Sequence, residues 1–498
     1  MQNLITAEQM HKVDEYTIQN KPIASIDLME QAARAFAQIF MQHEPNRDSE
    51  IAIFCGKGNN GGDGLAIAHL LTSYGYQNIN IYLVTFSKKE TADFAINKQR
   101  IKESSLKIIQ VSQPSDFLPI AAEILIDAIL GSGLNKPLSG KYADLSQIIN
   151  AQHKKVYAVD VPTGFFSEGP LNLEFNGIKA YKTISFQRPK INFFFPESIV
   201  ATEEFEVVNI GLDEAFIHKL ESDFILMEES DIRNLLHPRK RFTHKGTYGH
   251  ALIVAGNVNT MGAALLASSA CLHSGAGLTT ACIPQSGLIA LNSILPEVMA
   301  LTRDGYMEIE RLESYKAIAI GPGLGISEEN EMLLEQLIIR SNCPLVIDAD
   351  ALNILAQRQD LLDKLPQNTI ITPHMKEFDR LFGEHENWWT RVQKAKIEAQ
   401  TRKLVIVLKN QYTFVCVPDG KIYINPSGNP AMAQGGMGDI LTGILAAFVA
   451  QGYPTKESAL LACYVHGKAG DELADLSFVV PAGEIAHQLP KTIKSLSF

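Results

Sequence analysis

Short apolar runs alternate with longer amphipathic stretches from Glu50 onward, which is the pattern of strands followed by helices. The clearest early runs, rich in Ile, Val and Leu, span residues 51–55, 79–86, 124–128 and 156–161. Because a helical stretch separates each run from the next, the pattern predicts βαβ units that build a mostly parallel sheet. The fold class is therefore α/β.

The segment before the first strand, residues 6–42, predicts two helices. Thr6 is a suitable N-cap, and Gln9 follows it at the spacing of a capping box.

A second series of strands follows a break in the first. Residues 209–224 predict a polar helical stretch, and the apolar runs then resume. The later runs span residues 251–256, 317–321, 344–350, 368–373 and 404–409. A chain of 498 residues is too long for one core, so we place a boundary near residue 220 and expect two three-layer α/β domains, 1–220 and 221–498.

Composition narrows the classes of partner. The chain is 46% hydrophobic and 20% charged, as globular proteins are, and its formal net charge of -11 argues against nucleic acid as a partner. The chain contains no run of 18 apolar residues, so we expect no membrane association. The six cysteines show no C-x-x-C spacing, which favours a reducing, cytoplasmic location.

The first glycine-dense segment, residues 55–76, predicts a strand end, a loop and a helix that stops at Gly75. Gly56, Gly58 and Gly61 match G-x-G-x-x-G, so a dinucleotide-binding dehydrogenase is a rival hypothesis. Asp63 weakens that hypothesis because a carboxylate at a helix N-terminus would repel a pyrophosphate.

The end of the next strand also disagrees with a dehydrogenase. It reads Thr85, Phe86, Ser87, where an acidic ribose-binding residue is expected. A tight turn alone would not require the whole run from Asn59 to Gly64, so we expect the loop to be functional.

Two further strand ends carry polar clusters. Asp127 leads into residues 131–137, and Asp160 is followed by Thr163. Because the carboxyl ends of parallel strands meet at one edge, we expect these clusters and the glycine loop to face one crevice. Oxygen atoms of Asn60, Asp127 and Thr163 could also ligate a hard cation there.

These motifs support a family resemblance. GKGNNGGDG, DAILGSGL and DVPTG resemble the N-terminal, Rossmann-like epimerase domain of the bifunctional NAD(P)H-hydrate repair enzymes. The resemblance implies that Asp160 is catalytic and that Asn60, Asp127 and Thr163 bind K⁺. It also implies that the hydrated nucleotide contacts Asn59, Asn60, Gly61, Gly62, Asp63, Gly131, Ser132, Gly133, Leu134, Asn135, Lys136, Pro137 and Asp160.

The second glycine-dense segment lies at residues 425–452. Gly435, Gly436 and Gly438 precede Asp439 and an apolar helix. Backbone amides of such a turn suit a transferring phosphoryl group, and Asp439 is placed to take a proton from an attacking hydroxyl. Asp439 could also simply cap the helix, but the glycines before it are poor helix formers without a ligand reason.

This segment resembles the ribokinase-like superfamily. With HKGTYGHALIVAGN, GPGLG, TPHMKEF and KNQYT, the pattern over residues 240–490 is similar to the ADP-dependent NAD(P)H-hydrate dehydratases. The resemblance implies that the hydrate contacts Ala263, Gly323, His374 and Asp439, with Asp439 catalytic. It implies that ADP contacts Lys409, Asn410, Gln411, Tyr412, Thr413 and Gly438. Met437 departs from the family pattern, because it has no hydroxyl to offer a phosphate.

Together the two resemblances imply one activity. The N-terminal domain would epimerise the R and S forms of NADHX and NADPHX, and the C-terminal domain would dehydrate the S form with ADP, giving AMP and phosphate. Mg²⁺, oriented through water by Glu377, would assist the dehydratase, and a homo-oligomer is expected.

Two rival hypotheses stay open. One is a ribokinase-type kinase for a vitamin alcohol fused to a ligand-binding domain, since fold does not fix function. In the other, the N-terminal domain senses a ligand or binds a protein without catalysing.

Overall fold

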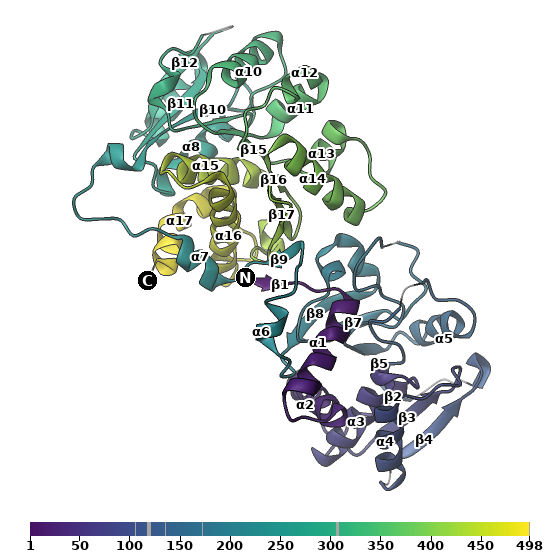
Figure 1. Ribbon diagram of the computed structural model, residues 1–498. Helices are drawn as coiled ribbons and strands as arrows, with labels where there is room; N and C mark the ends of the chain where they lie inside the picture. The colour runs from purple at the N-terminus through teal and green to yellow at the C-terminus, as the bar shows by residue number, and fades with distance from the viewer. Residues whose placement is uncertain (105, 117–120, 135, 172, 305–307, 498) are drawn as a thin grey trace. The chain divides into compact units, whose positions relative to one another are not determined.

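The computed structural model describes residues 1–498 except 105, 117–120, 135, 172, 305–307 and 498 (Figure 1). The chain forms two compact units. The N-terminal unit comprises Asn3–Ser222 with Asn387–Trp389, and the C-terminal unit comprises Met1–Gln2, Asp223–Glu386 and Thr390–Phe498.

The N-terminal unit is built on a seven-stranded sheet in the order β4-β3-β2-β5-β6-β7-β8, with every neighbouring pair parallel. Its strands are β2 (Ile51–Cys55), β3 (Ile79–Val84), β4 (Lys107–Val111), β5 (Ile124–Ala128), β6 (Lys155–Val159), β7 (Ala180–Phe186) and β8 (Thr202–Val208). Its helices are α1 (Ala7–Asn20), α2 (Ser25–His43), α3 (Asn59–Ser73), α4 (Ala92–Lys102), α5 (Lys141–Asn150) and α6 (Glu214–Ile217).

Both faces of this sheet are covered. Ile51 and Ile53 of β2 pack with α2 and α3 residues in one core, while Ala52 and Phe54 pack with Leu145 of α5 in another. A strand buried on both faces reads as a continuous apolar run, which is why IAIFC shows no polar alternation. The three-layer α/β expectation is confirmed for this unit.

The C-terminal unit has an eleven-stranded sheet in the order β1-β9-β18-β17-β16-β15-β14-β13-β10-β11-β12. Strand β17 runs antiparallel to β16 and β18. The strands are β1 (Gln2–Asn3), β9 (Phe224–Leu226), β10 (His250–Val254), β11 (Leu278–Pro284), β12 (Met299–Arg303), β13 (Ala317–Ile320), β14 (Leu345–Ile347), β15 (Ile370–Ile371), β16 (Val405–Leu408), β17 (Thr413–Cys416) and β18 (Ile422–Asn425).

Helices cover this sheet too, and α15 packs against α8, α16 and strands β10 and β13. The helices are α7 (Glu229–Leu235), α8 (Met261–His273), α9 (Leu288–Ile294), α10 (Glu328–Arg340), α11 (Ala349–Gln357), α12 (Gln359–Leu362), α13 (Met375–Phe382), α14 (Trp388–Arg402), α15 (Met437–Ala450), α16 (Thr455–Ala474) and α17 (Ala482–Leu496). Within the described residues, no helix has the length and apolar character needed to cross a membrane.

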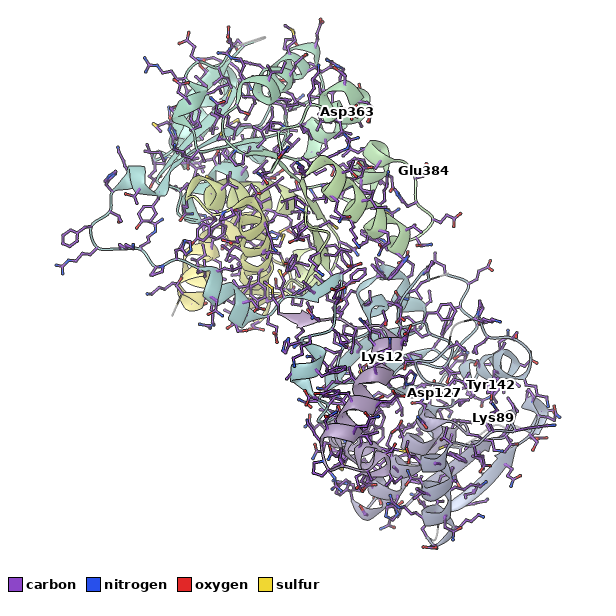
Figure 2. The ribbon with its side chains drawn as sticks, viewed as in Figure 1. Lys12, Lys89, Asp127, Tyr142, Asp363 and Glu384 are labelled. Carbon is purple, nitrogen blue, oxygen red and sulfur yellow. The ribbon has the colours of Figure 1, made fainter. Side chains whose placement is uncertain are left out.

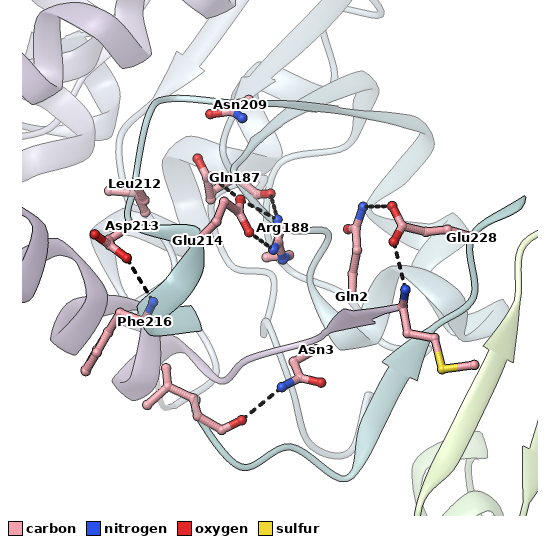
Figure 3. A network of polar contacts seen from close by, with 12 residues as sticks. Gln2, Asn3, Gln187, Arg188, Asn209, Leu212, Asp213, Glu214, Phe216 and Glu228 are labelled. Carbon is pink, nitrogen blue, oxygen red and sulfur yellow. Dashed lines mark hydrogen bonds and ion pairs between the residues drawn. The ribbon is translucent and has the colours of Figure 1, made fainter. Parts of the chain in front are cut away.

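Local predictions fared differently along the chain. The capping box of Thr6 and Gln9 is present at the start of α1, with both hydrogen bonds formed. The predicted helical stretch 209–224 was wrong in extent, because only α6 is helical there. Gly211 has a left-handed φ of 84°, and Asp213 then caps α6 by accepting the Phe216 N–H at 2.9 Å. Figure 3 shows this turn and the neighbouring Arg188–Glu214 ion pair.

Candidate active sites

The glycine-dense segment after β2 is largely helical. The sequence predicted a loop up to Gly64, but α3 already begins at Asn59, and this correction has a packing reason. A Cβ on Gly61 would lie 2.0 Å from the Gly56 carbonyl oxygen, and one on Gly64 would lie 2.6 Å from the Ala128 Cβ. These glycines therefore let α3 approach the sheet closely.

A cavity of about 630 Å³ opens at the carboxyl ends of β2, β5 and β6. Asn59, Asn60 and Asp63 from the start of α3 and Asp160 after β6 line it, as do residues of α1 and α2. Its wall after β5 consists of Leu130, Gly131, Ser132, Gly133 and Leu134. The residues that follow β2, β5 and β6 therefore line one cavity, as the sequence predicted.

Asp160 sits in a constrained position on this cavity. Its φ is 64°, a left-handed conformation that non-glycine residues adopt only when their surroundings hold them there. Its Oδ1 lies 2.7 Å from Lys190 Nζ and accepts the Phe186 N–H at 3.0 Å and the Ser185 hydroxyl at 3.3 Å. These contacts leave the second oxygen, Oδ2, with no hydrogen bond to any described residue.

Several carboxyl groups face this cavity. Burial raises the pKa of Asp14 to about 6. Burial also raises the pKa of Asp63 well above its usual range, and the carboxylates of Asp160, Asp14 and Asp93 add to the rise. Carboxyl groups with raised pKa values beside an ion-paired Asp160 form an arrangement suited to general acid–base chemistry.

Asp127, labelled in Figure 2, is buried in β5 next to the cavity wall. It accepts hydrogen bonds from the Thr163 N–H at 2.7 Å, the Thr163 hydroxyl at 2.8 Å and the Ile129 N–H at 3.2 Å. Thr163 in turn accepts the Leu130 N–H at 2.9 Å. Burial raises the pKa of Asp127 to about 6, and no ion pair with a described residue offsets its charge.

Asn60 lies beside the same wall. A Cβ on Gly131 would stand 3.3 Å from the Asn60 Cβ, and the Asn60 Nδ2 is buried without a partner among the described residues. An orphaned polar atom at a cavity wall is a feature of ligand sites.

Most predicted residues of this site, though not all, line the cavity. Gly61 and Gly62 are buried in helix packing, Lys136 and Pro137 are exposed, and Asn135 lies outside the described residues. Sequence analysis missed Lys190, His11, Asp14 and Asp93. The signal for Lys190 was its position directly before Ile191 and close to the aromatic run 193–195, because a buried lysine requires a carboxylate partner.

In the C-terminal unit, the glycine turn ends at the N-terminus of α15. Gly436 has a φ of 93°, and a Cβ there would lie 2.7 Å from the Leu266 side chain. The turn therefore requires glycine at this position. Asp439 follows in the first helical turn, where burial raises its pKa to about 6, the Asp348 carboxylate adds to the rise and Lys409 opposes it.

Lys409 and the buried Asp348 form an ion pair beside this turn. Lys409 Nζ lies 2.7 Å from Asp348 Oδ1, and the Thr442 hydroxyl donates to Asp348 Oδ2 at 2.8 Å. A Cβ on Gly438 would lie 3.4 Å from Lys409 Nζ. The ammonium group therefore lies next to the amide-rich turn.

His374 and Glu377 adjoin the same lysine. His374 pairs with Lys409 in an isolated parallel bridge, and Lys409 Nζ lies 4.0 Å from Glu377 Oε2. His374 caps α13, its Nδ1 accepting the N–H groups of Lys376 and Glu377, while Glu377 Oε2 accepts the His374 N–H at 2.8 Å. His374 is thus a half-exposed capping residue at the predicted edge rather than a buried core histidine.

The GPGLG loop reaches the same strand ends. A Cβ on Gly321 would lie 1.8 Å from the Asp348 carbonyl oxygen, and one on Gly323 would lie 2.9 Å from the Ala263 Cβ. The Gly325 N–H donates to Asp350 Oδ2 at 2.8 Å. Ala263 and Gly323, which the resemblance assigns to the same hydrate, are therefore neighbours.

A cavity of about 470 Å³ adjoins the turn. Of the predicted nucleotide contacts, Lys409, Asn410, Gln411, Thr413 and Gly438 line it, and Tyr412 does not. Asp439 directly follows the lining residue Gly438 without itself lining the cavity. Sequence analysis missed Asp348, although it stands at a strand end, and His466 on α16, which lines the cavity.

Comparison with known families matches both units. Residues 251–492 match the family model described as NAD(P)H-hydrate dehydratase, and residues 25–192 match that of the YjeF-related protein N-terminus.

Two full-length relatives carry the same name. The chain is 33% identical to the bifunctional NAD(P)H-hydrate repair enzyme Nnr of Moorella thermoacetica, over 99% of this chain and 97% of that protein. It is 32% identical to the Coxiella burnetii protein of that name, over 91% of each.

A solved structure agrees with the fold of the C-terminal unit. The ribokinase-like superfamily protein of Enterococcus faecalis matches with a TM-score of 0.51 and 28% identity, over 56% of this chain and 98% of that one. The ribokinase-like prediction is confirmed.

Proposed function

The chain belongs to the family of bifunctional NAD(P)H-hydrate repair enzymes, and from this premise we propose how its two sites divide the work. The cavity around Asp160 epimerises the hydrate, and the site around Asp439 dehydrates the S form with ADP. One observation carries the assignment: each unit places a carboxylate beside a lysine at the edge of its sheet, next to a glycine-containing helix start.

In the dehydratase site, Asp439 acts as general base. It takes the proton from the hydrate hydroxyl as that oxygen bonds to the terminal phosphorus of ADP, and the bond between the two phosphoryl groups breaks to release AMP. Lys409 and the amides after Gly436 offset the charge that develops on the phosphoryl oxygens.

The next step removes phosphate. The lone pair of the ring nitrogen expels it from the phosphorylated carbon, and loss of a proton from the neighbouring carbon restores the dihydropyridine. The hydrate and ADP thus give the reduced nicotinamide, AMP and phosphate. Met437 begins α15 and offers no hydroxyl to a phosphate, so in this scheme it would serve the turn through its backbone amide alone.

In the epimerase site, Asp160 works at the damaged ring. The hydroxyl leaves as water after gaining a proton, the ring nitrogen carries the positive charge, and water returns to the other face with loss of a proton. Lys190 pairs with Asp160 through Oδ1, which leaves Oδ2 to exchange protons with the ring substituent.

K⁺ fits beside Asp127. The carboxylate is buried and carries no ion pair among the described residues, the Thr163 hydroxyl contacts it, and Asn60 lies against Gly131 on the wall that follows β5. A bound K⁺ would supply positive charge next to the wall formed by residues 130–134.

Mg²⁺ fits the dehydratase site in a different way. Among the described residues, no three His, Cys, Asp or Glu side chains gather to hold a metal ion, so Mg²⁺ would take most ligands from phosphate oxygens and water. Asp348, Asp350 and Asp439 outnumber Lys409 there, which leaves negative charge for a hydrated cation to offset. Glu377 orients the water shell.

Two assays test the proposal separately. Exchange between purified epimers without ADP should be lost in Asp160→Asn and kept in Asp439→Asn. Formation of AMP and phosphate in equal amounts from the S epimer and ADP should be lost in Asp439→Asn and kept in Asp160→Asn. Exchange that persists in Asp160→Asn would instead support an N-terminal unit that binds a ligand without catalysing.

A further inference from the structure

His466 is a polar side chain with no role in the chemistry described above. It lies on α16 and lines the cavity beside Lys409 and Gly438. Its Nε2 is buried and makes no hydrogen bond with any described residue. Asn410, on the same cavity, has a buried Nδ2 in the same condition. Buried polar atoms are nearly always paired in native proteins, so two orphans in one cavity indicate a ligand.

The charge of His466 limits which part of a ligand it meets. Burial, together with the nearby charge of Lys409, lowers the pKa of His466 to about 4. The imidazole is therefore neutral at physiological pH, and the Asn410 amide is neutral as well. Neither the imidazole nor the amide can offset the charge of a phosphate, and the proposed phosphate contacts are Lys409 and the backbone amides at the start of α15. The two orphans therefore face an uncharged, hydrogen-bonding part of the ligand.

The rest of the cavity suits a flat ring. Apolar side chains of Met432, Met437, Leu441 and Cys463 line it. Asn425, a polar lining residue, is satisfied internally, because its amide donates to the carbonyls of Ser427 and Cys463 and its Oδ1 accepts the Ser427 hydroxyl. An apolar slot with a few unpaired polar atoms at its edge is typical of nucleobase sites.

We propose that His466 is a specificity-determining residue, whose Nε2 hydrogen-bonds the edge of the adenine ring of the nucleotide while Asn410 Nδ2 donates to a second acceptor on the ligand. This inference rests on the proposed nucleotide site and deepens it. A neutral imidazole and an amide can distinguish adenine from other bases, because a base that does not offer matching hydrogen-bonding atoms leaves these buried groups unpaired and therefore binds more weakly.

Calorimetric titration of the intact chain with ADP tests the proposal. His466→Phe keeps a flat ring but removes the nitrogen, and we expect it to bind ADP about tenfold more weakly. His466→Gln, which restores a polar atom, should bind more tightly than His466→Phe and serves if the phenylalanine variant fails to fold. His250→Gln is the matched control, because His250 is another partly buried histidine of this unit and lies outside the cavity.

Ligand analogues then locate the contact. Each of three ADP analogues removes one hydrogen-bonding function from the edge of the base: 1-deaza and 7-deaza replace a ring nitrogen acceptor by C–H, and N6-dimethyl replaces the amino N–H donors by methyl groups. One of them should bind the unsubstituted protein about tenfold more weakly than ADP but bind His466→Phe no more weakly than ADP does. Ribose 5-phosphate, which lacks the base, should bind His466→Phe and the unsubstituted protein alike.

The outcomes separate this inference from the proposed function. Three results would each overturn the nucleobase contact alone. The first is an ADP affinity that is unchanged in both His466 variants, and the second is a loss of affinity for each analogue that is the same in His466→Phe as in the unsubstituted protein. The third is a loss of ribose 5-phosphate affinity in His466→Phe that is as large as the loss of ADP affinity. Failure of the unsubstituted chain to bind any adenine nucleotide would overturn both.

Discussion

Lys409 Nζ lies 2.7 Å from Asp348 Oδ1, across 61 positions of the sequence. The hydroxyl of Thr442, on α15, donates to the other carboxylate oxygen of Asp348. The Lys409–Asp348 pair and this hydrogen bond therefore connect the ends of β14 and β16 to the helix that begins with the glycine turn. The lysine is thereby fixed beside Gly438 before any nucleotide binds, which reduces the ordering cost of binding.

Lys409→Met should lower stability as well as activity. The variant leaves Asp348, which is 1% exposed, as an unpaired buried charge. We expect a loss of about 3 kcal/mol in the free energy of unfolding. Urea denaturation measures it, and the double variant Lys409→Met/Asp348→Asn should recover most of the stability without the activity. A double variant no more stable than Lys409→Met would contradict the pairing.

Dehydration should depend on the ionisation of Asp439. Its pKa of about 6 means that the carboxylate form predominates above pH 6, so kcat should fall about tenfold per pH unit below it. Calorimetry of ADP binding over the same pH range separates titration of the nucleotide from that of the enzyme. In Asp439→Glu, kcat should still fall at acidic pH, but the midpoint of the fall should lie at a different pH. A kcat that stays flat down to pH 5 would exclude Asp439 as the base.

K⁺ should stabilise the N-terminal unit through Asp127. The pKa of this carboxyl is about 6 in the folded chain against an ordinary 3.8, so the folded state holds the proton more tightly. Its contribution to the free energy of unfolding therefore decreases as pH rises from about 4 to 6 and stays low above that range. A cation beside the ionised group offsets this loss, so KCl should raise Tm at pH 8 relative to tetramethylammonium chloride.

The K⁺ effect has a direct control. In Asp127→Asn, the difference between the two salts should vanish, because the charge that attracts the ion is gone. At pH 5 the unsubstituted protein should also show a smaller difference. An equal Tm gain in the variant would remove Asp127 from the cation site.

Lys190→Met should impair epimerisation selectively. Without the ammonium group, Asp160 Oδ1 loses the partner that holds the carboxylate in place, and general acid–base catalysis of this kind is worth about 100-fold or more in rate. Epimer exchange, followed chromatographically without ADP, should fall by that factor, while the dehydration rate of the pure S form stays unchanged. Loss of both rates together would point to general misfolding instead, which circular dichroism would reveal.

The sheet edges were predictable because buried parallel strands leave a strong local pattern. IAIFC and ILIDA match β2 and β5 residue for residue, and Asp63 after β2 and Asp160 after β6 line one cavity, as the predicted convergence of the strand ends requires. Such predictions need only the period of the pattern and the rule that parallel strands end at the same edge.

What was missed depends on long-range packing. Asp14 lies on α1, whose polar pattern does not indicate that one face borders the cavity. His466 lies in a largely apolar stretch, and the sequence alone does not distinguish a histidine that lines a cavity from one that is hydrogen-bonded in the core. The glycines after β2 were assigned to a loop, yet Gly61 and Gly64 serve contacts with Gly56 and Ala128 that only the folded sheet creates.

In the proposed scheme, two sites act in succession on one damaged cofactor. The most direct test of this succession is to supply a mixture of both hydrate epimers with ADP and follow the absorbance of the reduced nicotinamide, with an enzyme-free sample to measure spontaneous exchange. The unsubstituted chain should recover the whole mixture, Asp160→Asn only the S fraction at the enzymatic rate, and Asp439→Asn none. No recovery with either ADP or ATP would contradict the account and favour a small-molecule kinase.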